Sequence, residues 1–406
     1  MVWIDGRPVR RNQYREAHDV HAHYAARLER VAALGIEALR FWQGWAISNP
    51  APGVYDFAID RRIVDHCRER GILPHLIGDI VHFGVPDWIE GHWQNPRAPR
   101  FMADYAIARA RAFPEMRFFT PVNEPFMAEW CALLGWWNEG LTDMRAFVRG
   151  MKHQAQGTIL SRAGIEAVWR AEDRSGQPVW FMNDAFQPRW RWEPVADDTR
   201  TLLQFCSLDL MLGHRDPRMR AFLLEHGMTG AEYEWFMEHG SPQRVVVGID
   251  YYPMFDPAWG HRKIREFTRD NLLSIIERVH ERYPQCPIMH MEVNALPADA
   301  LAVWSGTVRA FLEAQGRGIP IVGLSWFGDE VQIGWGNRLL DDEVRQVGLW
   351  HYGEAQAIGR AVARTASYLR RRDDVGFMAR PTLQPDLSEV DAMRVEETLA
   401  EPVRVN

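Results

Sequence analysis

The sequence alternates amphipathic helical segments with short apolar segments, and this alternation restricts the possible folds more than any other feature. Each apolar segment follows a helical one, and Gly35 and Gly71 stand where helices commonly end. The predicted helices span residues 20–34, 58–70, 101–113, 144–170, 199–239, 264–282 and 299–315, and the predicted strands span residues 36–42, 72–78, 117–122, 179–183, 245–251, 287–292 and 319–326. Strands that alternate with helices in this way predict a parallel sheet of the α/β class.

Length and composition permit one large folding unit. The chain has 406 residues, of which 47% are hydrophobic, and this is enough to bury a large core. No stretch has the composition of a linker between two domains. From about residue 379 the composition changes, with Pro381, Pro385 and Pro402 among acidic residues. We therefore expect one domain over residues 1–378 and an extended polar tail over residues 379–406.

The charge and the cysteines restrict the partners and the location. A formal net charge of −7 argues against nucleic acid or an anionic membrane as the main partner, because either would favour a basic surface. Four widely spaced cysteines without a Cys-x-x-Cys pair are typical of reduced thiols. The first residues lack the apolar core of a signal peptide, and no apolar run reaches the ~18 residues of a membrane span. We expect a cytoplasmic protein that binds a small neutral ligand.

Two of the predicted strands deliver a glutamate to their carboxyl ends. Glu124 follows the strand at 117–122 and is preceded by Asn123, and Glu292 ends the strand at 287–292. A carboxyl group in an apolar cleft is pushed toward its neutral form and can then act as an acid near neutral pH. Hydrolysis of an acetal needs two carboxyl groups that flank the bond, and these two glutamates are the best candidates. The alternative for either residue is an ordinary surface carboxylate.

The segment Thr-Pro-Val-Asn-Glu-Pro at 120–125 resembles the Thr-Phe-Asn-Glu-Pro signature of family 1 glycoside hydrolases, the β-glucosidase family of a large clan of retaining glycosidases. The chain also resembles the glycosidase-like domain that is found fused to dTDP-4-dehydrorhamnose reductase-like domains. The family resemblance implies a single (β/α)8 TIM barrel, with an assumed first strand within residues 1–14 completing the eight. It also implies that Glu124 is the acid/base, that Glu292 is the nucleophile about 5–5.5 Å away, and that neither metal nor organic cofactor is needed.

The resemblance extends to residues around the two glutamates. Leu-Arg-Phe-Trp at 39–42 resembles the family's Tyr-Arg-Phe-Ser, and so implies that Arg40 keeps the nucleophile ionised. Gly-Ile-Asp-Tyr-Tyr at 248–252 resembles Gly-Ile-Asn-Tyr-Tyr, whose last residue, here Tyr252, hydrogen-bonds the nucleophile. The remaining supporting residues implied by the resemblance contact the sugar: His82 and Asn123 by hydrogen bonds to hydroxyl groups, and Trp326 as a flat platform.

The departures from the family concern sugar recognition. Phe83 replaces a Trp, so an indole donor is lost, and Asp250 replaces an Asn, which adds a possible negative charge. The family's Glu that binds the 4- and 6-hydroxyls falls near Ile333, where Asp329, Glu330 or Gln332 are possible substitutes. The first-strand Gln of the family has no counterpart, and the Asn after the nucleophile is displaced by one position, to Asn294. The sequence therefore indicates bond-cleaving residues more firmly than it indicates the sugar.

Three other functions are compatible with the same or similar sequence motifs. A transglycosylase or biosynthetic enzyme would use the same covalent intermediate, and a non-catalytic sugar-binding protein could keep the scaffold. A metal-dependent hydrolase is suggested by His21 and His23, which resemble the His-x-His ligands that amidohydrolases place after their first barrel strand. Such ligands should follow an apolar strand, whereas polar residues precede these two and a helix face follows them. We expect a retaining β-glycosidase that hydrolyses a small soluble β-glycoside.

Overall fold

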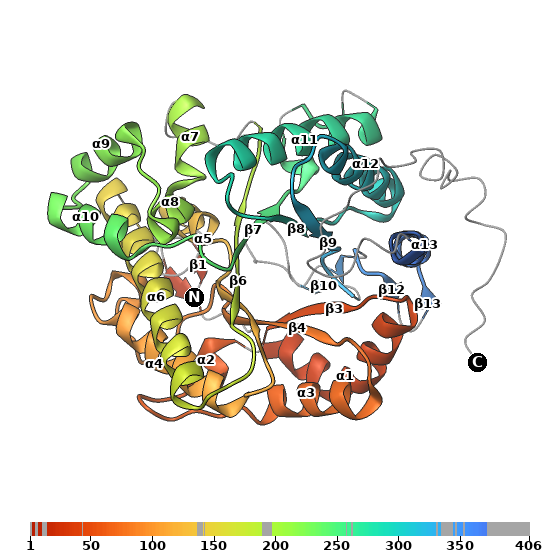
Figure 1. Cartoon of the computed structure of the whole chain (residues 1–406), viewed down its shortest axis with the longest axis horizontal. Coiled ribbons are helices and arrows are strands. Elements are labelled where there is room, and N and C mark those ends of the chain that lie inside the picture. Colours follow the sequence, from red (N-terminus) through yellow and green to blue (C-terminus); the bar gives the residue numbers. More distant parts are fainter. Residues whose placement is uncertain are drawn as a thin grey trace.

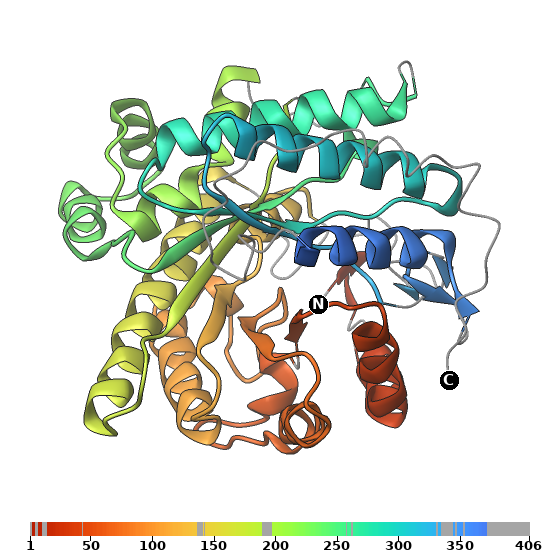
Figure 2. The same ribbon diagram turned by 45° about the vertical axis from the view of Figure 1, so that its right-hand side comes forward.

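The computed structural model describes residues 2–4, 7–9, 14–42, 44–135, 141, 143–188, 197–256, 258–260, 263–329, 332–333, 344–345, 347–351 and 354–371. Seven strands form one parallel sheet in the chain order β3-β4-β5-β6-β7-β8-β9. The sheet curls, and helices cover its outer side (Figures 1 and 2). The chain is therefore an α/β protein of the (β/α)8 barrel class. The strands are β3 Ala38–Trp42, β4 His75–Val81, β5 Phe118–Val122, β6 Val179–Ala185, β7 Val245–Asp250, β8 Ile288–Glu292 and β9 Ile321–Leu324.

The described residues within 1–14 do not form the first barrel strand that was expected there. The described residues of this segment form two short strands, β1 Val2–Ile4 and β2 Arg7–Val9, which pair antiparallel with each other and with no strand of the barrel. Only Asp5-Gly6 separates them, and this dipeptide is a strong signal for a hairpin. Parallel pairing needs a connection of a dozen residues or more, so the short connection permits only the antiparallel arrangement.

Most of the predicted helices match the structure closely. Residues 58–70 and 264–282 begin and end as predicted, whereas the long helix predicted at 199–239 divides into four. It is interrupted at Gly213 and Gly227, which have φ of 72° and 100°, and new helices begin at the capping residues Asp216 and Thr229. The helices are α1 Tyr14–Ala33, α2 Trp45–Ser48, α3 Ala58–Arg70, α4 Ala98–Ala112, α5 Pro125–Leu133, α6 Met144–Ala171, α7 Asp197–Leu203, α8 Cys206–Leu212, α9 Pro217–Glu225, α10 Gly230–His239, α11 Ile264–Arg282, α12 Pro297–Gly316 and α13 Ala357–Arg371.

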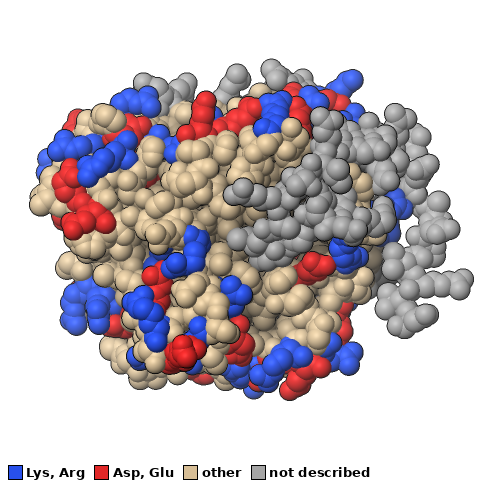
Figure 3. Space-filling model, viewed as in Figure 1, with Lys and Arg blue, Asp and Glu red and all other residues tan. Residues whose placement is uncertain are grey.

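Short elements complete the described part. Two 3₁₀ turns are η1 His92–Gln94 and η2 Pro253–Phe255; two small antiparallel pairs are β10 Gln332–Ile333 with β11 Val344–Arg345, and β12 Trp350–His351 with β13 Glu354–Ala355. No helix among the described residues is long and apolar enough to cross a membrane. The four cysteines are free and buried. On the face shown in Figure 3, acidic and basic side chains are interspersed around the rim. The predicted tail at 379–406 lies outside the described residues.

Two apolar layers hold the sheet in place. The larger one packs the strands against the helices, and the smaller one gathers alternate residues of β4, β6, β7 and β8, so we assign it to the barrel interior. The buried members of the interior layer are Ile77, Val179, Phe181, Val246, Met289 and Met291. Alternate residues of a strand share a face. Asp79, Asn183 and Asp250 therefore lie on the interior face, beyond the apolar layer and toward the carboxyl ends of the strands.

Candidate active site

The carboxyl ends of β4, β5, β7 and β8 meet at one edge of the barrel. The Asn123 N–H donates to the Val81 carbonyl oxygen over 2.9 Å, which ties the end of β5 to the end of β4. Asp250 is paired with Glu292 across β7 and β8, after a register shift between Ile249 and Asp250. The shift matters because an extra residue in one strand redirects the side chains that follow it. It places Asp250 and Glu292 opposite each other.

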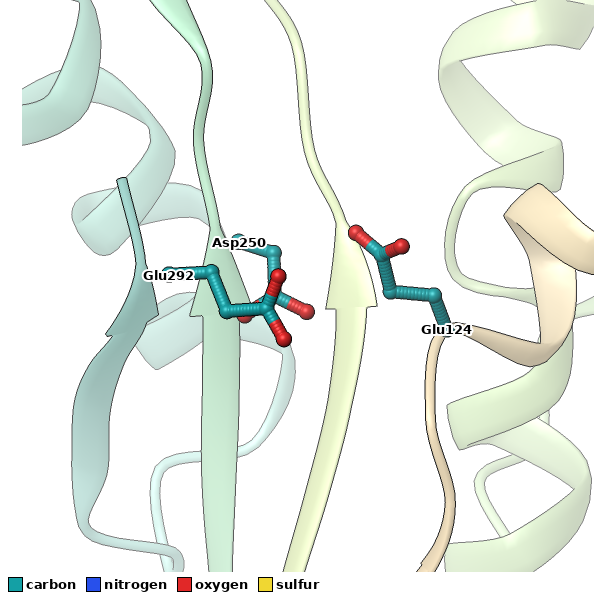
Figure 4. A group of neighbouring side chains, drawn as sticks. All are labelled: Glu124, Asp250 and Glu292. Carbon is teal, nitrogen blue, oxygen red and sulfur yellow. The ribbon is translucent and has the colours of Figure 1, made fainter. Parts of the chain in front are cut away.

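Three buried carboxyl groups come together at this edge. One carboxylate oxygen from each of Glu124, Asp250 and Glu292 lies within 4.8 Å of the corresponding oxygens of the other two. Figure 4 shows Asp250 and Glu292 on neighbouring strands, with Glu124 facing them from the start of α5. Glu124 and Glu292 are each 6% exposed, and Asp250 is fully buried. The two predicted glutamates are thus brought together, and a third carboxyl group accompanies them.

Glu292 is held by two donors. One carboxylate oxygen, Oε1, is 2.8 Å from Nη1 of Arg40, and the other, Oε2, accepts a hydrogen bond of 2.5 Å from the Tyr252 hydroxyl. Hydrogen bonds to an ionised group are stronger than those between neutral groups. Both predicted neighbours of Glu292 therefore contact it, one at each carboxylate oxygen.

Arg40 connects the carboxyl cluster with two residues at its edge. Its Nε donates to Asp79 Oδ1 over 2.8 Å, and its Nη2 donates to the Asn123 side-chain oxygen. His82 Nδ1 lies 3.0 Å from the other Asp79 oxygen. Burial by itself would raise the pKa of Asp79, but Arg40 and His82 hold that pKa below its ordinary value. The guanidinium and the imidazole are thus oriented by one ionised carboxylate.

Glu124 has an unusual backbone conformation. Its φ of 41° and ψ of 60° are left-handed, a region that non-glycine residues rarely occupy and that costs about 1–3 kcal/mol. Glu124 stands at the N-cap position of α5, yet its side chain caps nothing. Asp184 of β6 instead accepts the backbone N–H groups of Phe126 at 3.0 Å and Met127 at 3.4 Å, and the Ser207 hydroxyl at 2.5 Å. Because Asp184 supplies the cap, the Glu124 carboxyl group can face the cluster.

The surroundings of Glu124 and Asp250 favour their neutral forms. Burial is the largest cause that raises the pKa of Glu124 well above its ordinary value, followed by the negative charges of Asp250 and Glu292. Burial and then the charge of Glu292 likewise raise the pKa of Asp250. Burial also raises the pKa of Asp184, to about 7. Burial and the neighbouring carboxyl groups thus favour the protonated forms of Glu124 and Asp250.

A chain of amides links the two sides of the cluster. Asn183 Nδ2 donates to the Asn123 Oδ1 at 2.7 Å and also to Asp250 Oδ2. Within the described residues, Nδ2 of Asn123, Oδ1 of Asn183 and Oδ1 of Asp250 are buried and have no hydrogen-bond partner. Such groups are costly to bury unless a ligand or water completes them. Asn123, predicted to contact the sugar, therefore still has a donor to offer.

Sequence reasoning missed three residues of this arrangement, namely Asp79, Asn183 and Asp184. Each of them lies in a strand and is almost fully buried, and each makes contacts that orient a predicted residue. A signal was present, because polar side chains near the ends of otherwise apolar barrel strands are unexpected unless they serve a site. The strands were predicted at 72–78 and 179–183, whereas they span His75–Val81 and Val179–Ala185, so Asp79 and Asp184 lie just beyond the predicted ends.

His82 and Trp326 occupy the ends of β4 and β9. The His82 ring packs edge-on against Phe83, with 4.8 Å between the ring centroids. Trp326 is 9% exposed, donates its indole N–H to the Val347 carbonyl oxygen over 2.8 Å, and packs edge-on against Trp304 of α12. The next residue, Phe327, donates its N–H to the Val293 carbonyl oxygen, which brings the chain after β9 beside the chain after Glu292. The predicted sugar-binding roles of His82 and Trp326 stay predictions.

The possible substitutes for the missing Glu are only partly described. Asp329 binds the Arg27 guanidinium of α1, with Oδ2 at 2.6 Å from Nε, so its carboxylate is engaged by a cation. Glu330 and the side chains of Gln332 and Ile333 lie outside the described residues. Recognition of the distal hydroxyls therefore stays untested by the structure.

The two histidines that suggested a metal site do not follow a strand. His21 and His23 lie within α1, and the His23 side chain is exposed. A helix places these residues two positions apart, which directs their side chains to different faces. The strand-end context that an amidohydrolase site requires is therefore contradicted.

Comparisons with known proteins agree with this architecture. No protein-family model matches the chain, and no curated protein matches its sequence. A β-glucosidase from Thermotoga maritima in complex with deoxynojirimycin is similar in structure, with a TM-score of 0.70, 15% identity, and coverage of 86% of this chain and 87% of that one. A β-glucosidase from Exiguobacterium marinum gives a TM-score of 0.71 and 18% identity over 90% of this chain and 92% of that one. The GH1 β-glucosidase from Exiguobacterium antarcticum B7 gives a TM-score of 0.70 and 15% identity over 87% of this chain and 88% of that one. The chain therefore has the fold of family 1 β-glucosidases over most of its length.

Proposed function

We propose that this protein is a retaining β-glycosidase that hydrolyses a small β-glycoside through a covalent glycosyl-enzyme intermediate. The observation that carries the proposal is a pair of buried carboxyl groups with opposite surroundings, whose nearest oxygens are within 4.8 Å. Retaining enzymes place their carboxyl groups about 5–5.5 Å apart, whereas inverting enzymes leave about 6.5–9.5 Å for a water molecule. The short separation favours direct attack by one carboxylate.

Glu292 is the proposed nucleophile. Arg40 and Tyr252 each donate to one of its carboxylate oxygens and so fix the orientation of both. Its carboxylate attacks the anomeric carbon, the glycosidic bond to the leaving oxygen breaks, and a glycosyl ester forms. The Glu292 carboxylate loses its negative charge when the ester forms. Arg40 then still has an anionic partner, because its Nε donates to Asp79. The guanidinium therefore need not move between the two states.

Glu124 is the proposed acid and base. Burial and then the neighbouring carboxyl groups raise its pKa well above the ordinary value, which favours the protonated form that can give a proton to the leaving oxygen. After the aglycone departs, the same group, now ionised, removes a proton from a water molecule that attacks the glycosyl ester. If a sugar hydroxyl replaces water in this step, the same residues perform transglycosylation. The left-handed backbone of Glu124 fits this role, since strained residues collect at functional sites.

The remaining predicted residues are proposed to bind the sugar. Nδ2 of Asn123 is a buried donor without a protein partner and can bind the hydroxyl next to the anomeric carbon. His82 and Trp326 are assigned to a hydroxyl contact and to packing under the ring. We also propose membership of the glycoside hydrolase family, a place in carbohydrate metabolism, and a cytoplasmic location, which the four free cysteines support. The resemblance to the reductase-fused domain stays a hypothesis.

The proposal is tested by trapping the intermediate. The wild type and Glu292→Gln are incubated with a panel of aryl 2-fluoro-2-deoxy-β-glycosides and examined by intact mass and peptide mapping. We expect one glycosyl group on Glu292 in the wild type and none in the variant. In parallel, NMR of the first product should show the β-anomer. An α-anomer as the first product, or an absence of both turnover and adduct over the whole panel, would overturn the proposal.

A further inference from the structure

Asp79 is a buried carboxylate that contacts two residues of the candidate site. It lies in β4, is 2% exposed, and is paired across the sheet with Trp42 of β3. Its Oδ1 accepts from Arg40 Nε over 2.8 Å, and its Oδ2 lies 3.0 Å from His82 Nδ1. Burial acts to raise the pKa of Asp79, but Arg40 and His82 outweigh it and hold that pKa below its ordinary value. Both Asp79 oxygens are therefore engaged, so any effect of Asp79 on the reaction passes through these two neighbours.

The Arg40 guanidinium extends the contact from Asp79 to Glu292. Nη1 of Arg40 is 2.8 Å from Glu292 Oε1, and Nη2 donates to Asn123 Oδ1. A guanidinium is planar and its N–H groups diverge at fixed angles, so a partner at Nε also sets the directions of the other two nitrogens. The side chain of Arg40 is 12% exposed and that of Asp79 is 2% exposed, which leaves little room for water to replace their contact. Asp79 therefore fixes the donors that face Glu292 and Asn123.

Two carboxylates share the charge of Arg40. Among the described residues, Asp79 and Glu292 are the carboxylates that form ion pairs with this guanidinium. When Glu292 becomes a glycosyl ester its oxygens are no longer anionic, and Asp79 is the ion-pair partner that Arg40 keeps. A buried cation that loses its anionic partner is strongly destabilised. The presence of Asp79 therefore spares the first chemical step this penalty.

We propose that Asp79 is a positioning residue for the first chemical step, because it holds Arg40 in place and balances its charge while Glu292 is esterified. The inference rests on the proposed function, since it assumes that Glu292 is the nucleophile. In this step one Glu292 oxygen forms a bond to the anomeric carbon, the bond from that carbon to the leaving oxygen breaks with its electron pair, and Glu124 protonates the leaving oxygen. The change of charge is reversed in the second step, when water releases the Glu292 carboxylate.

The two chemical steps should respond differently to the loss of the Asp79 charge. In Asp79→Asn, Glu292 is the ion-pair partner left to Arg40, so esterification of Glu292 leaves the guanidinium without a carboxylate in contact. The first step should therefore slow. The second step regenerates the Glu292 carboxylate beside Arg40 and restores an ion pair, so it should be unaffected or accelerated. A residue that only supports packing would not separate the two steps in this way.

Asp60 provides a matched control for the loss of a buried carboxylate. It is fully buried in α3 and forms an ion pair with Arg109 of α4, which is 1% exposed. This pair likewise joins a buried aspartate to a buried guanidinium, but Arg109 lies over the rings of Phe41 and Phe113 and not against the carboxyl cluster. Asp60→Asn should therefore lower the melting temperature without separating the two chemical steps.

The test measures the two steps separately with the dinitrophenyl 2-fluoro-2-deoxy-β-glycoside that labels the wild type. The rate of adduct formation, followed by intact mass, reports the first step, and the recovery of activity by the isolated adduct reports the second. In Asp79→Asn we expect adduct formation to slow at least about 10-fold and recovery to slow less than about 2-fold. Asp79→Ser, whose side chain is smaller, is a second variant with the same expected result. Asp60→Asn should keep the ratio of the two rates within about 2-fold of the wild-type ratio.

Equal slowing of both steps in the Asp79 variants, or no slowing of either, overturns the inference. A failure of both Asp79 variants to fold while Asp60→Asn folds also overturns it, since Asp79 would then be needed for the structure. If the wild type forms the Glu292 adduct and the Asp79 variants keep its rates, the proposed function stands although the inference fails. If the wild type forms no adduct with any member of the panel, the proposed function fails first.

Discussion

The ends of β5 and β8 carry the same residue type at one edge of the barrel, but the surroundings of the two side chains are opposite. Glu124 and Glu292 are equally buried, each 6% exposed. Glu292 is bound by the Arg40 guanidinium and the Tyr252 hydroxyl, so its charge is compensated. Among the described residues no hydrogen bond or ion pair reaches the Glu124 carboxyl group; its neighbours are carboxyl groups, and burial raises its pKa. The comparison teaches that the neighbours, and not the glutamates themselves, divide the roles of acid and nucleophile.

The two ends also differ in their backbones. Glu292 is the last residue of a buried strand whose register shift aligns it with Asp250. Glu124 is held in a left-handed conformation at the start of a helix. Asp184 keeps that helix start in place through two backbone N–H groups. One end is therefore positioned by strand pairing, and the other by a cap from a neighbouring strand.

The largest expected effect is a loss of kcat/KM whose dependence on the leaving group differs between the variants of the two glutamates. Glu292→Gln should reduce kcat/KM by at least about 10³-fold for every aryl glycoside, because the nucleophile is lost. Glu124→Gln should reduce it strongly for poor leaving groups and much less for dinitrophenyl glycosides, whose departure needs no proton. A plot of log kcat/KM against leaving-group acidity measures the difference. Equal slopes for the two variants would show that the roles are not divided in this way.

A smaller effect is expected when one of the two donors to the Glu292 carboxylate is removed. Tyr252→Phe removes a hydrogen bond to a charged group, which is worth about 1.5–3 kcal/mol, so kcat/KM should fall about 10- to 100-fold. Tyr283→Phe is a matched control, because Tyr283 is also buried and donates to a carboxylate, Asp209 Oδ1, at 2.8 Å. The control should lower the melting temperature without lowering kcat/KM. Equal losses of activity in both variants would indicate a general effect of packing.

Much of this arrangement could be predicted from the sequence. The positions of the seven barrel strands follow from apolar runs between helices, and Gly35 and Gly71 mark helix ends because they adopt φ of 76° and 63°. The proximity of Glu124 and Glu292 follows from the same pattern, since parallel strands end at one edge. The helix at 125–133 was not predicted, although Pro125 suits a first helical position.

The rest depends on contacts between residues that are distant in the chain. Asp184 caps a helix that begins 58 residues earlier, measured from Phe126, and no local pattern shows this pairing. The position of Asp250 beside Glu292 depends on a register shift that apolar periodicity does not reveal. The hairpin at the amino end was missed because residues 1–14 were assigned to the barrel by count, whereas the Asp5-Gly6 dipeptide already indicated a turn.

A third prediction tests whether the cap from Asp184 positions Glu124. Asp184→Ala should destabilise the protein by about 0.5–2 kcal/mol, as other lost caps do, and should lower kcat/KM about 10-fold because the α5 start can shift. Removal of a negative neighbour should also move the upper limb of the pH–rate profile to lower pH. Asp143→Ala, which removes the cap of α6 at the Ala146 N–H, is the matched control. It should reduce stability alone, and an unchanged pH profile in Asp184→Ala would contradict the positioning role.

The last expected effect concerns stability and leaves the catalytic rate aside: it is the pH dependence of stability that Asp184 imposes. Burial raises the pKa of Asp184 to about 7 in the folded protein, whereas the unfolded chain has an ordinary value of about 3.9. Between these values the folded state binds the extra proton, so stability is greatest at the acid end and declines as pH rises toward 7. Asp184→Asn cannot titrate, so from pH 5 to pH 8 the variant should lose less stability than the wild type, by about 2–3 kcal/mol. Urea unfolding at several pH values measures this, with Asp143→Asn as the control. Parallel curves for Asp184→Asn and the wild type would mean that Asp184 is ionised in the folded protein, and the contrast between the two sides of the cleft would then rest on Glu124 and Asp250 alone.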